Sequence, residues 1–434
     1  YVGDIFGAPL AIEALMAFFL ESTLVGLFFF GWDRLSKEKH LAVTWLMALG
    51  TNLSALWILI ANGWMQHPIG SEFNIDTMRM ELASFSEVVF NPVAQVKFVH
   101  TVSAGYVTGA IFVLAISSWY LLKGRDLAFA RRSFAIASAF GLASALSVIV
   151  LGDESGYELG DVQKVKLAAV EAEWQTHPAP AAFTVFGIPN EATQTTDYAL
   201  KIPAVLGLIA TRSLDEPVPG LAELKAKHLE RIIRGQEAYV LMLQYRAGDK
   251  SPATVNRFNE IKEDLGYGML LTAYTDDVAN ATAEHIAQAV EDSVPQVWPL
   301  FWSFRIMVAC GFAMLLLFAL AFWHSAKRTV DKPKWLLKFA VFSLPLPWIA
   351  CEAGWFVAEY GRQPWAIGEI LPTHLAVSQL TVTDIWISLI SIMVLYTIFV
   401  IIEMWLMTKY AKIGPSSLHT GKYDLESPAV AKEA

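Results

Sequence analysis

Seven long apolar stretches constrain this chain more than any other feature of its sequence. They lie at about residues 8–31, 41–66, 93–123, 131–151, 299–325, 335–358 and 384–410. A helix needs roughly 20 consecutive apolar residues to cross the hydrocarbon core of a bilayer, and each stretch reaches that length. The composition agrees, because 55% of the residues are apolar and only 17% are charged. We therefore predict an all-α integral membrane helical bundle with about seven spans.

One long polar insert separates the first four predicted spans from the last three. We expect residues 152–298 to form this insert and to be mainly helical, since helical patterns run over about 162–175, 220–246 and 281–296. The division predicts four parts, which are spans at 1–151, the insert at 152–298, spans at 299–410 and a tail at 411–434.

The charged residues predict which side of the membrane each loop occupies. Basic residues gather in alternate loops, at 34–39, 123–132 and 327–334, and such loops are typically cytoplasmic. Arg79 and Arg362 are the only arginine or lysine residues in the short loops on the other side. We expect an extracytoplasmic insert and a cytoplasmic tail, which carries Lys409, Lys412 and Lys422. The net charge of −9 follows from acidic outer segments and tail, and it predicts no nucleic-acid partner.

Two cysteines and one histidine bound the choice of cofactor ligands. Cys310 and Cys351 both fall inside predicted spans, so neither a disulfide framework nor a CxxCH haem-attachment motif is present. Among nine histidines, only His100 lies well inside a span, roughly 10 Å below the surface at 1.5 Å per residue. Met307 lies at a similar depth, and histidine with methionine is a ligand pair for low-spin haem iron. Ordinary helix packing of both side chains is the alternative.

Glutamates in the first predicted span carry a second signal. Glu13 and Glu21 lie eight residues apart, a little over two turns, which places them on one helix face. Glu352 lies in the sixth span. An ionised carboxylate in the bilayer costs about 2.5–3.5 kcal/mol or more, so this face predicts contact with protons, cations or a metal. The alternative is protonated glutamates hydrogen-bonded to a neighbouring helix, such as the one carrying Ser54.

Charged residues at the outer surface form two further candidate groups. Arg362 follows the sixth span and can pair with a carboxylate, which is either a cofactor carboxylate or a nearby glutamate, Glu359 or Glu369. In the insert, Lys166 and Glu171 lie on one predicted helix near the membrane. Such an acid and base can take a proton from a hydroxyl substrate, and a solvated helix face is the alternative.

Several segments together resemble subunit I of the cytochrome bd quinol oxidases, with the long type of insert called the Q-loop. The combination of the VKFVH, FRIM and GRQPW segments is specific to that family, and the resemblance runs through the whole chain. The segments are YVGDIFGAPLAIEA (1–14), GWDRL (31–35), NLSALWILIANGWMQ (52–66), NPVAQVKFVHT (91–101), LGDESGYE (151–158), FRIMVACGF (304–312), EAGWFVAEYGRQPWAIGE (352–369) and IGPSSL (413–418).

The resemblance implies two haem b groups, one low-spin and one high-spin, and one haem d. His100 and Met307 match the ligands of the low-spin haem, and Glu13 matches a ligand of a high-spin haem. The remaining cofactor-binding positions match propionate partners, the base beside the high-spin haems and an aromatic residue among the haems, and they are Lys97, Arg305, Arg362 and Trp355.

The resemblance also implies where substrate and protons bind. Lys166 and Glu171 match the residues that bind quinol, and Glu359 matches the acid beside the high-spin haems. Glu21 and Ser54 match the proton route from the cytoplasm. The implied enzyme is a quinol:oxygen oxidoreductase of the bacterial inner membrane, which oxidises quinol at the periplasmic face. It reduces O2 to water and forms a proton gradient without pumping. The length of the insert resembles the class of the family that is associated with ubiquinol.

The implied partners are a second large subunit and small single-span subunits. Full-length members of the family carry two further spans before the position where this chain begins, and the first supplies the histidine ligand of one high-spin haem. We expect this chain to lack those spans as a truncated form of a normal subunit. Two alternatives are a seven-span receptor and a proton- or cation-coupled transporter that uses the intramembrane glutamates.

Overall fold

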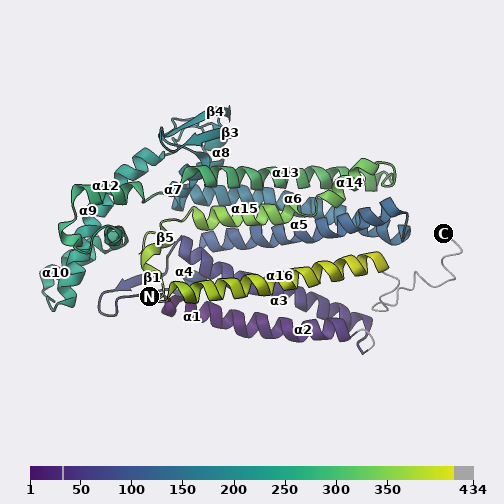
Figure 1. Cartoon of the computed structure of the whole chain (residues 1–434), viewed down its shortest axis with the longest axis horizontal. Coiled ribbons are helices and arrows are strands. Elements are labelled where there is room, and N and C mark those ends of the chain that lie inside the picture. The colour runs from purple at the N-terminus through teal and green to yellow at the C-terminus, as the bar shows by residue number, and fades with distance from the viewer. Residues whose placement is uncertain (32–33, 415–434) are drawn as a thin grey trace.

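The computed structural model describes residues 1–31 and 34–414, and it shows a long helical bundle with a smaller helical unit at one end (Figure 1). Most of the predicted tail at 411–434, most of the IGPSSL segment and two residues of the GWDRL segment therefore lie outside the described residues. We call residues 163–296 the insert, and the end of the bundle that carries them the insert end.

Six helical stretches in the described chain are long and apolar enough to cross a membrane, and a bent pair of helices makes a seventh. The bent pair is α14 and α15, which meet at 40°. This confirms the predicted membrane bundle of about seven spans. The stretches are α1 (Gly3–Ile12) with η1 (Glu13–Phe18) and α2 (Phe19–Phe30), α3 (Lys37–Gln66), α4 (Phe85–Val89) with α5 (Pro92–Lys123), α6 (Leu127–Val162), α13 (Val297–Ala326), α14 (Lys334–Phe342) with α15 (Leu346–Tyr360), and α16 (Val382–Ile413).

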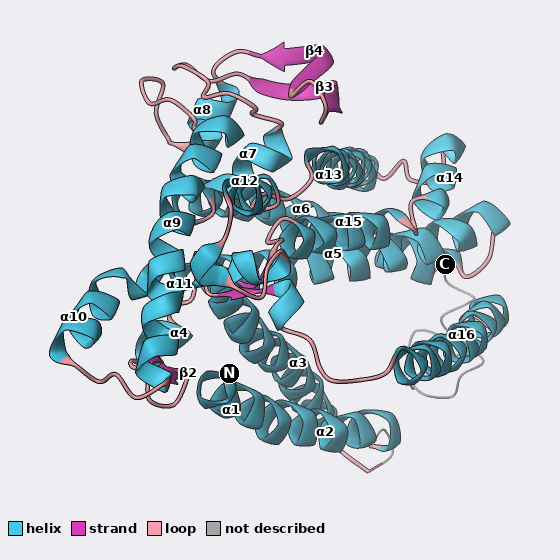
Figure 2. Cartoon of the chain, turned by 60° about the vertical axis from the view of Figure 1, so that its left-hand side comes forward, coloured by secondary structure: helices cyan, strands magenta, loops and turns pink. Residues whose placement is uncertain are grey.

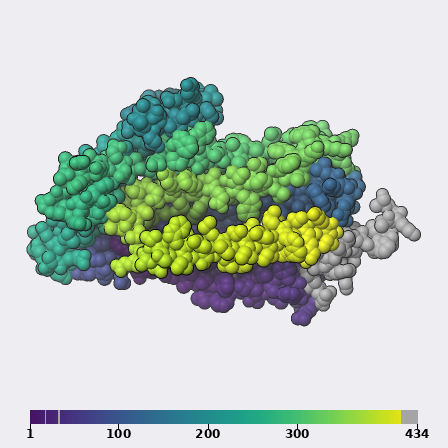
Figure 3. All heavy atoms as spheres, in the orientation of Figure 1, coloured from purple at the N-terminus to yellow at the C-terminus, as the bar shows by residue number. Residues whose placement is uncertain are grey.

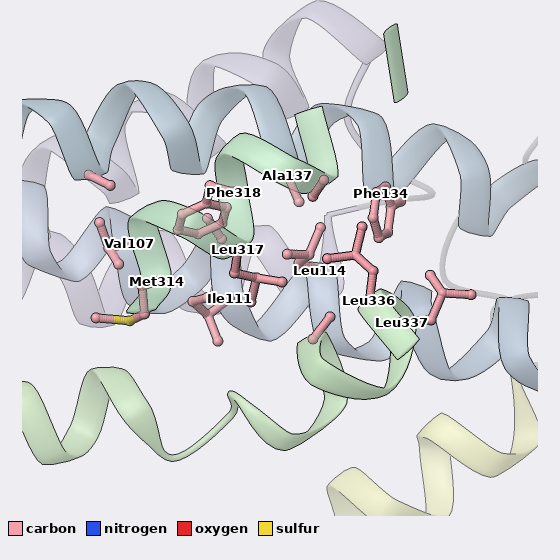
Figure 4. Packing of buried hydrophobic residues seen from close by; sticks show 14 of the residues in the cluster. Val107, Ile111, Leu114, Phe134, Ala137, Met314, Leu317, Phe318, Leu336 and Leu337 are labelled. Atoms are coloured by element: carbon pink, nitrogen blue, oxygen red, sulfur yellow. The ribbon is translucent and has the colours of Figure 1, made fainter. Parts of the chain in front are cut away.

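The main membrane core lies where α5, α6, α13 and α14 meet (Figure 4). Phe318 on α13 is fully buried there beside Leu317 and Phe134. A Cβ atom added at Gly141 on α6 would lie 2.1 Å from the Phe318 ring, so the two helices approach closely only because position 141 has no side chain. Close packing of this kind is what holds helices together in lipid.

The last helix, α16, stands apart from this core (Figure 2). None of its residues is buried in the chain. Its contacts lie near its C-terminal end, where Tyr120 Oη donates to the carbonyl oxygen of Ala411 at 2.8 Å and Arg125 Nη1 donates to that of Lys412 at 2.7 Å. Most of the α16 surface is therefore available to lipid or to other subunits.

The insert contains more than the three predicted helical stretches. These stretches correspond to α7 (Lys164–Glu171), α9 (Leu221–Arg246) and α12 (Ala283–Glu291), while a β-hairpin and three further short helices were not predicted. The additional elements are β3 (Phe183–Asn190), β4 (Thr195–Ile202), α8 (Val205–Ala210), α10 (Pro252–Ile261), α11 (Leu265–Leu270) and the 3₁₀ turns η2 (Lys262–Asp264), η3 (Leu271–Ala273) and η4 (Val278–Asn280). Strands β3 and β4 pair in antiparallel register with each other.

The helix of the fourth span continues beyond the predicted end of that span. We placed its end at residue 151, because the next residues include Asp153 and Glu154, whereas α6 continues to Val162. Charged residues leave the membrane without ending the helix, since glutamate and leucine favour helical backbone. The helix ends at Gln163, and α7 begins directly after it.

Loops at the insert end hold the insert against the bundle. Arg231 on α9 donates to Asp264 at 2.6 Å and to Glu369 at 2.6 Å, and Tyr267 Oη donates to Glu369 at 3.2 Å. Glu369 follows α15 in the loop that contains β5 (Trp365–Ile367), β6 (Leu371–Pro372) and η5 (Thr373–Leu375), and a hairpin of β1 (Ser71–Asn74) and β2 (Arg79–Leu82) lies at the same end. The insert is therefore fixed to the loop that carries Arg362.

Candidate functional site

A buried acid and base meet where α7 packs against α13. Arg305 Nη2 donates to Glu171 Oε2 at 2.8 Å, and both side chains are buried. Burial raises the pKa of Glu171 to about 7, although the charge and hydrogen bond of Arg305 oppose this change. The carboxyl group can therefore gain or lose a proton near neutral pH.

The backbone holds Arg305 in place. Its Nη1 atom donates to the carbonyl oxygen of Val170 at 2.6 Å, and its Nη2 and Nε atoms donate to that of Thr184 at 2.6 and 3.2 Å. Every side-chain nitrogen of Arg305 thus has an acceptor within the chain. A contact between Arg305 and a haem propionate would have to replace one of these bonds, and that role stays a prediction.

Lys166 lies on the same helix but contacts a different set of polar groups. Its Nζ atom donates to Gln66 Oε1 at 2.6 Å, to Gln163 Oε1 at 2.9 Å and to the carbonyl oxygen of Ala358 at 3.0 Å. These three acceptors match the three donors of an ammonium group. The contacts connect α7 with the ends of α3 and α15.

Burial changes the acid–base chemistry of Lys166. It lowers the pKa of Lys166 well below its usual range, and the positive charges of Lys97 and Arg362 lower it further. Only 2% of Lys166 and 3% of Glu171 is exposed, so the alternative that they form a solvated helix face is wrong.

A second polar group lies at the end of α15. Arg362 Nη2 donates to Glu359 Oε2 at 2.5 Å, Asn62 Nδ2 donates to Glu359 Oε1 at 2.8 Å, and Lys97 Nζ donates to Asn62 Oδ1 at 2.9 Å. The ion pair with Glu359 is one of the two alternatives that the sequence left open. Arg362 Nη1, however, is buried and has no hydrogen-bond partner in the described chain. A buried guanidinium with a free donor can bind a further carboxylate.

Gln66, at the end of α3, joins the two groups and was not among the predicted site residues. It accepts a hydrogen bond from Lys166 and donates from Nε2 to Glu359 Oε1 at 3.4 Å. Asn62 was missed as well. The available signal was two amide side chains four residues apart in the apolar segment 52–66, a spacing that puts both on one helix face.

A cavity of about 740 Å³ lies between these groups and the insert. Gln66 and Arg362 line it from the bundle, and Lys166, His228 and Arg231 line it from the insert, whereas Glu171 is not among its lining residues. Burial lowers the pKa of His228 to about 4, so this imidazole is neutral at pH 7. The cavity gives Lys166 a neighbouring space that can hold water.

Each predicted ligand of the low-spin haem lies beside a glycine of another helix. A Cβ atom at Gly152 would lie 3.3 Å from His100 Cε1, and one at Gly354 would lie 2.9 Å from Met307 Sδ. His100 Nδ1 is buried and has no hydrogen-bond partner in the described chain. This nitrogen is therefore not satisfied by helix packing, and the site residues fit a haem whose iron binds an imidazole.

The structure brings Glu13 and Ser54 together and leaves Glu21 without such a partner. Ser54 Oγ donates to Glu13 Oε1 at 2.8 Å. This is the kind of bond expected if the glutamates are hydrogen-bonded to the neighbouring helix that carries Ser54. Among the described residues, no hydrogen bond or ion pair involves the Glu21 side chain, which is half-buried. Glu352 and Trp355 on α15 are exposed in the isolated chain, Trp355 by 51%.

Glu13 also begins a π-helix. The segment η1 (Glu13–Phe18) interrupts the first membrane-crossing stretch between the two glutamates. A π-helical turn contains one more residue than an α-helical turn, and such turns occur often at functional sites. The relative direction of Glu13 and Glu21 therefore depends on this turn as well as on their eight-residue spacing.

Comparison with known proteins decides the family. The family model described as "Cytochrome bd terminal oxidase subunit I" matches residues 1–415. The chain belongs to this family. Cytochrome bd-II ubiquinol oxidase subunit 1 of Escherichia coli (strain K12) is 58% identical over 420 residues, which cover 97% of this chain and 82% of that protein. Cytochrome bd ubiquinol oxidase subunit 1 of Bacillus subtilis (strain 168) is 32% identical over 426 residues, or 98% of this chain and 78% of that protein.

A solved structure gives independent support for the cytochrome bd fold. The bd oxidase from Geobacillus thermodenitrificans matches with a TM-score of 0.68 at 24% sequence identity, covering 95% of this chain and 79% of that chain. At this identity the match supports the fold alone. Membership of the family makes the chain a subunit of a membrane-embedded terminal quinol oxidase, and it implies haem cofactors and a second subunit. It favours the oxidase over the receptor and transporter alternatives. That two spans precede Tyr1 stays a prediction.

Proposed function

We propose that this chain is the haem-carrying subunit of a bacterial oxidase that oxidises quinol at the insert end and reduces O2 to water with protons taken from the opposite side. The observation that carries the proposal is the buried Glu171–Arg305 pair, in which the carboxyl pKa of about 7 suits a proton acceptor. The name of the Escherichia coli relative supports ubiquinol as the substrate.

Glu171 and Lys166 serve two steps of quinol oxidation. Glu171 accepts a proton from quinol, and Lys166 passes a proton on. Ionised Glu171 accepts a hydroxyl proton from quinol, and Arg305 holds the carboxylate in position through its own backbone contacts. Lys166 has a lowered pKa and lines the cavity. It can therefore pass a proton to water in the cavity, which lies toward the insert.

The proposed haem sites rest on the family match and, for His100 and Arg362, on a buried nitrogen without a hydrogen-bond partner in the described chain. His100 and Met307 would hold a low-spin haem b, and Glu13 would hold a high-spin haem. The proposed set is two haem b groups and one haem d, which when bound supply one-electron transfer and O2 reduction. Arg362 offers its free Nη1 donor to a propionate, and Lys97 and Trp355 are further cofactor contacts.

The intramembrane carboxylates supply protons to the oxygen site. Glu21 has no hydrogen-bond or ion-pair partner in the described chain, so it is available to exchange protons with water. Ser54 can pass a proton between this region and Glu13, because a hydroxyl group both donates and accepts. Glu359, the proposed acid beside the high-spin haems, lies at the insert end and pairs with Arg362.

Opposite sides for proton release and proton uptake produce a gradient without a pump. The sidedness follows from the basic loops described above, with the insert periplasmic and the C-terminal tail cytoplasmic. In this assignment residues 152–298 are the Q-loop, and the spans at 1–151 and 299–410 carry the haems. The partners are a second large subunit, small single-span subunits, quinol and O2.

The test is steady-state kinetics of the purified complete oxidase, with Glu171→Gln and Lys166→Met compared with the parent. We expect each variant to keep its haem spectrum and to lose most of its quinol oxidation. An artificial electron donor that reduces the haems directly should restore O2 consumption. Parent-level quinol oxidation in both variants would contradict the proposed site.

A further inference from the structure

The β3–β4 hairpin has an apolar exposed surface at one end and a polar one at the other. Near the base of the hairpin, Phe186 is 46% exposed, Leu200 is 62% exposed and Ile202 is 47% exposed. Phe186 and Leu200 are paired across the two strands. The connection between the strands instead contains Glu191, Thr193 and Gln194. Exposed apolar side chains continue along the strands to Ile188 and Tyr198, which are 43% and 84% exposed, and the turn itself is polar.

Two contacts fix how the hairpin lies along the membrane-crossing helix α13. Glu191 Oε1 accepts hydrogen bonds from the backbone nitrogens of Val297 at 2.7 Å and Trp298 at 3.0 Å, at the first residues of α13. Thr184, at the other end of β3, accepts hydrogen bonds from Arg305. The polar turn therefore lies at the start of α13, and the apolar base lies eight residues further along it.

The helix length converts this position into a depth. The 30 residues of α13 span about 45 Å, which matches a bilayer including its headgroup layers. Arg305 lies about 12 Å from the start of α13 at 1.5 Å per residue. The base of the hairpin is therefore within about 5 Å of the boundary between headgroups and hydrocarbon, whereas the polar turn is level with the outer edge of the headgroups.

The hairpin lies on the outside of the bundle at this level. Figures 1 and 2 both place it beside α13 and away from the other membrane helices, and it forms a raised flank in Figure 3. Trp302 packs edge-on against Phe186 with ring centroids 5.4 Å apart, and Trp298 is 52% exposed. Tryptophan is enriched at membrane interfaces, so the apolar base continues the lipid-facing surface of α13.

We propose that the base of the β3–β4 hairpin is embedded in the interface of the bilayer, with Phe186, Leu200 and Ile202 in contact with lipid. A two-stranded hairpin has unpaired backbone groups along its edges, which cannot enter hydrocarbon without a large cost. The headgroup boundary satisfies both requirements, because it supplies water to the edges and acyl chains to the side chains.

This position has a consequence that rests on the proposed quinol oxidation. Arg305 binds the backbone of Thr184 and the side chain of Glu171 at the same time. The embedded hairpin therefore forms a wall between surrounding lipid and the proposed quinol site. A quinol with a long isoprenoid tail would enter the site from the membrane by moving past this hairpin.

The embedding can be tested without any enzymatic assay. A nitroxide spin label is attached at Leu200→Cys, and separately at Gln194→Cys in the turn of the same hairpin, in the complete oxidase reconstituted in nanodiscs of phosphatidylethanolamine and phosphatidylglycerol. The parent, in which this chain contains Cys310 and Cys351, measures background labelling. Power saturation then compares relaxation by O2, which partitions into lipid, with relaxation by a water-soluble nickel chelate.

We expect the label at position 200 to relax more with O2 than with nickel, and the label at position 194 to show the reverse. Preferential relaxation by nickel at both positions would overturn the embedding. Protection of position 200 from both reagents would also overturn it, because another protein would then cover the hairpin.

A kinetic comparison tests the wall separately. Leu200→Asp should raise KM for a long-tailed quinol and leave KM for a short-tailed analogue and both kcat values unchanged. Equal KM changes for the two substrates would refute the wall. The spin-label result stands whether or not quinol is the substrate, so failure of the proposed function can be distinguished from failure of the embedding.

Discussion

Gln66 Oε1 accepts a hydrogen bond of 2.6 Å from Lys166 Nζ, while Nε2 of the same side chain donates to Glu359 Oε1 at 3.4 Å. One glutamine at the end of α3 thus links the proposed quinol site to the ion pair at the end of α15. An amide can do this because it carries both an acceptor and donors. The positions of the Lys166 and Glu359 side chains are linked through this residue.

Replacement of Gln66 by leucine should weaken both groups. Gln66→Leu keeps an aliphatic side chain but leaves the buried Lys166 ammonium with one acceptor fewer, at a cost of about 1–3 kcal/mol. We expect a lower midpoint of thermal unfolding for the purified oxidase and slower quinol oxidation. Gln95→Leu is a matched control, because Gln95 is exposed and donates only to the carbonyl oxygen of Phe90. Equal stability of the two variants would contradict the coupling.

The pKa of Glu171 predicts how the rate depends on pH. Burial raises this pKa from 4.5 to about 7, so the carboxyl group is protonated below that value and cannot accept a quinol proton. Quinol oxidation should therefore increase as the pH rises through about 7. Glu171→Gln should remove this increase, whereas Glu173→Gln, which changes a buried acid two residues away, should retain it but move it to lower pH, because the charge of Glu173 raises the pKa of Glu171. A pH profile of kcat/KM for the three proteins provides the measurement.

His100 and Met307 can be tested by spectroscopy. His100→Ala removes the proposed nitrogen ligand, and Gly354→Ala places a methyl group 2.9 Å from the Met307 sulfur. Reduced-minus-oxidised spectra should show loss of the low-spin haem in the first variant and an altered low-spin band in the second. Gly311→Ala is the control for the added methyl group, since nothing in the described chain lies within 4 Å of its Cβ position. An unchanged low-spin band in His100→Ala would disprove the ligand assignment.

Glu21 and Glu13 lie in the same membrane-crossing stretch, but only Glu13 has a hydrogen-bond partner in the described chain, so different substitutions test them. Glu21→Gln retains shape and hydrogen bonding but cannot exchange a proton, so we expect a folded, haem-replete oxidase with slower O2 consumption. Ser54→Ala removes the hydrogen bond to Glu13 and should change the high-spin haem spectrum. The assay requires the complete oxidase with its second subunit. O2 consumption at the parent rate in Glu21→Gln would rule out a relay.

The membrane bundle could be predicted from sequence because its signal is local. Each span is an uninterrupted apolar stretch, and lipid accepts few other structures. The end of α6 lay outside this signal, because hydropathy reports the edge of lipid, while the helix continues to Val162 through Asp153 and Glu154. The β3–β4 hairpin was missed because its strands are stabilised by distant contacts, such as that between Arg305 and Thr184, which the local sequence does not show.

The candidate site was only partly predictable for a related reason. Lys166, Glu171 and Arg362 stood out as charges close to the membrane, and the family resemblance supported them. Their partners could not be assigned, because the contact between Lys166 and Gln66 joins residues 100 positions apart in the chain. An amide side chain in an apolar helix carries no charge and gives a weak signal. Burial of such residues becomes evident only when the helices are packed.

The π-helix at Glu13–Phe18 determines how this part of the chain tolerates insertions and deletions. A π-helical turn is one residue longer than an α-helical turn, so deletion of one residue between Glu13 and Phe18 can leave a continuous α-helix. Secondary structure and hydropathy would both survive. The residues before and after the turn would also keep nearly the same relative orientation, because about five π-helical residues and about four α-helical residues complete a similar rotation. Deletion of a residue in the regular α-helix on either side would instead rotate one part of the span against the other by about 100°, so the π-helical turn is where this span can lose a residue most safely.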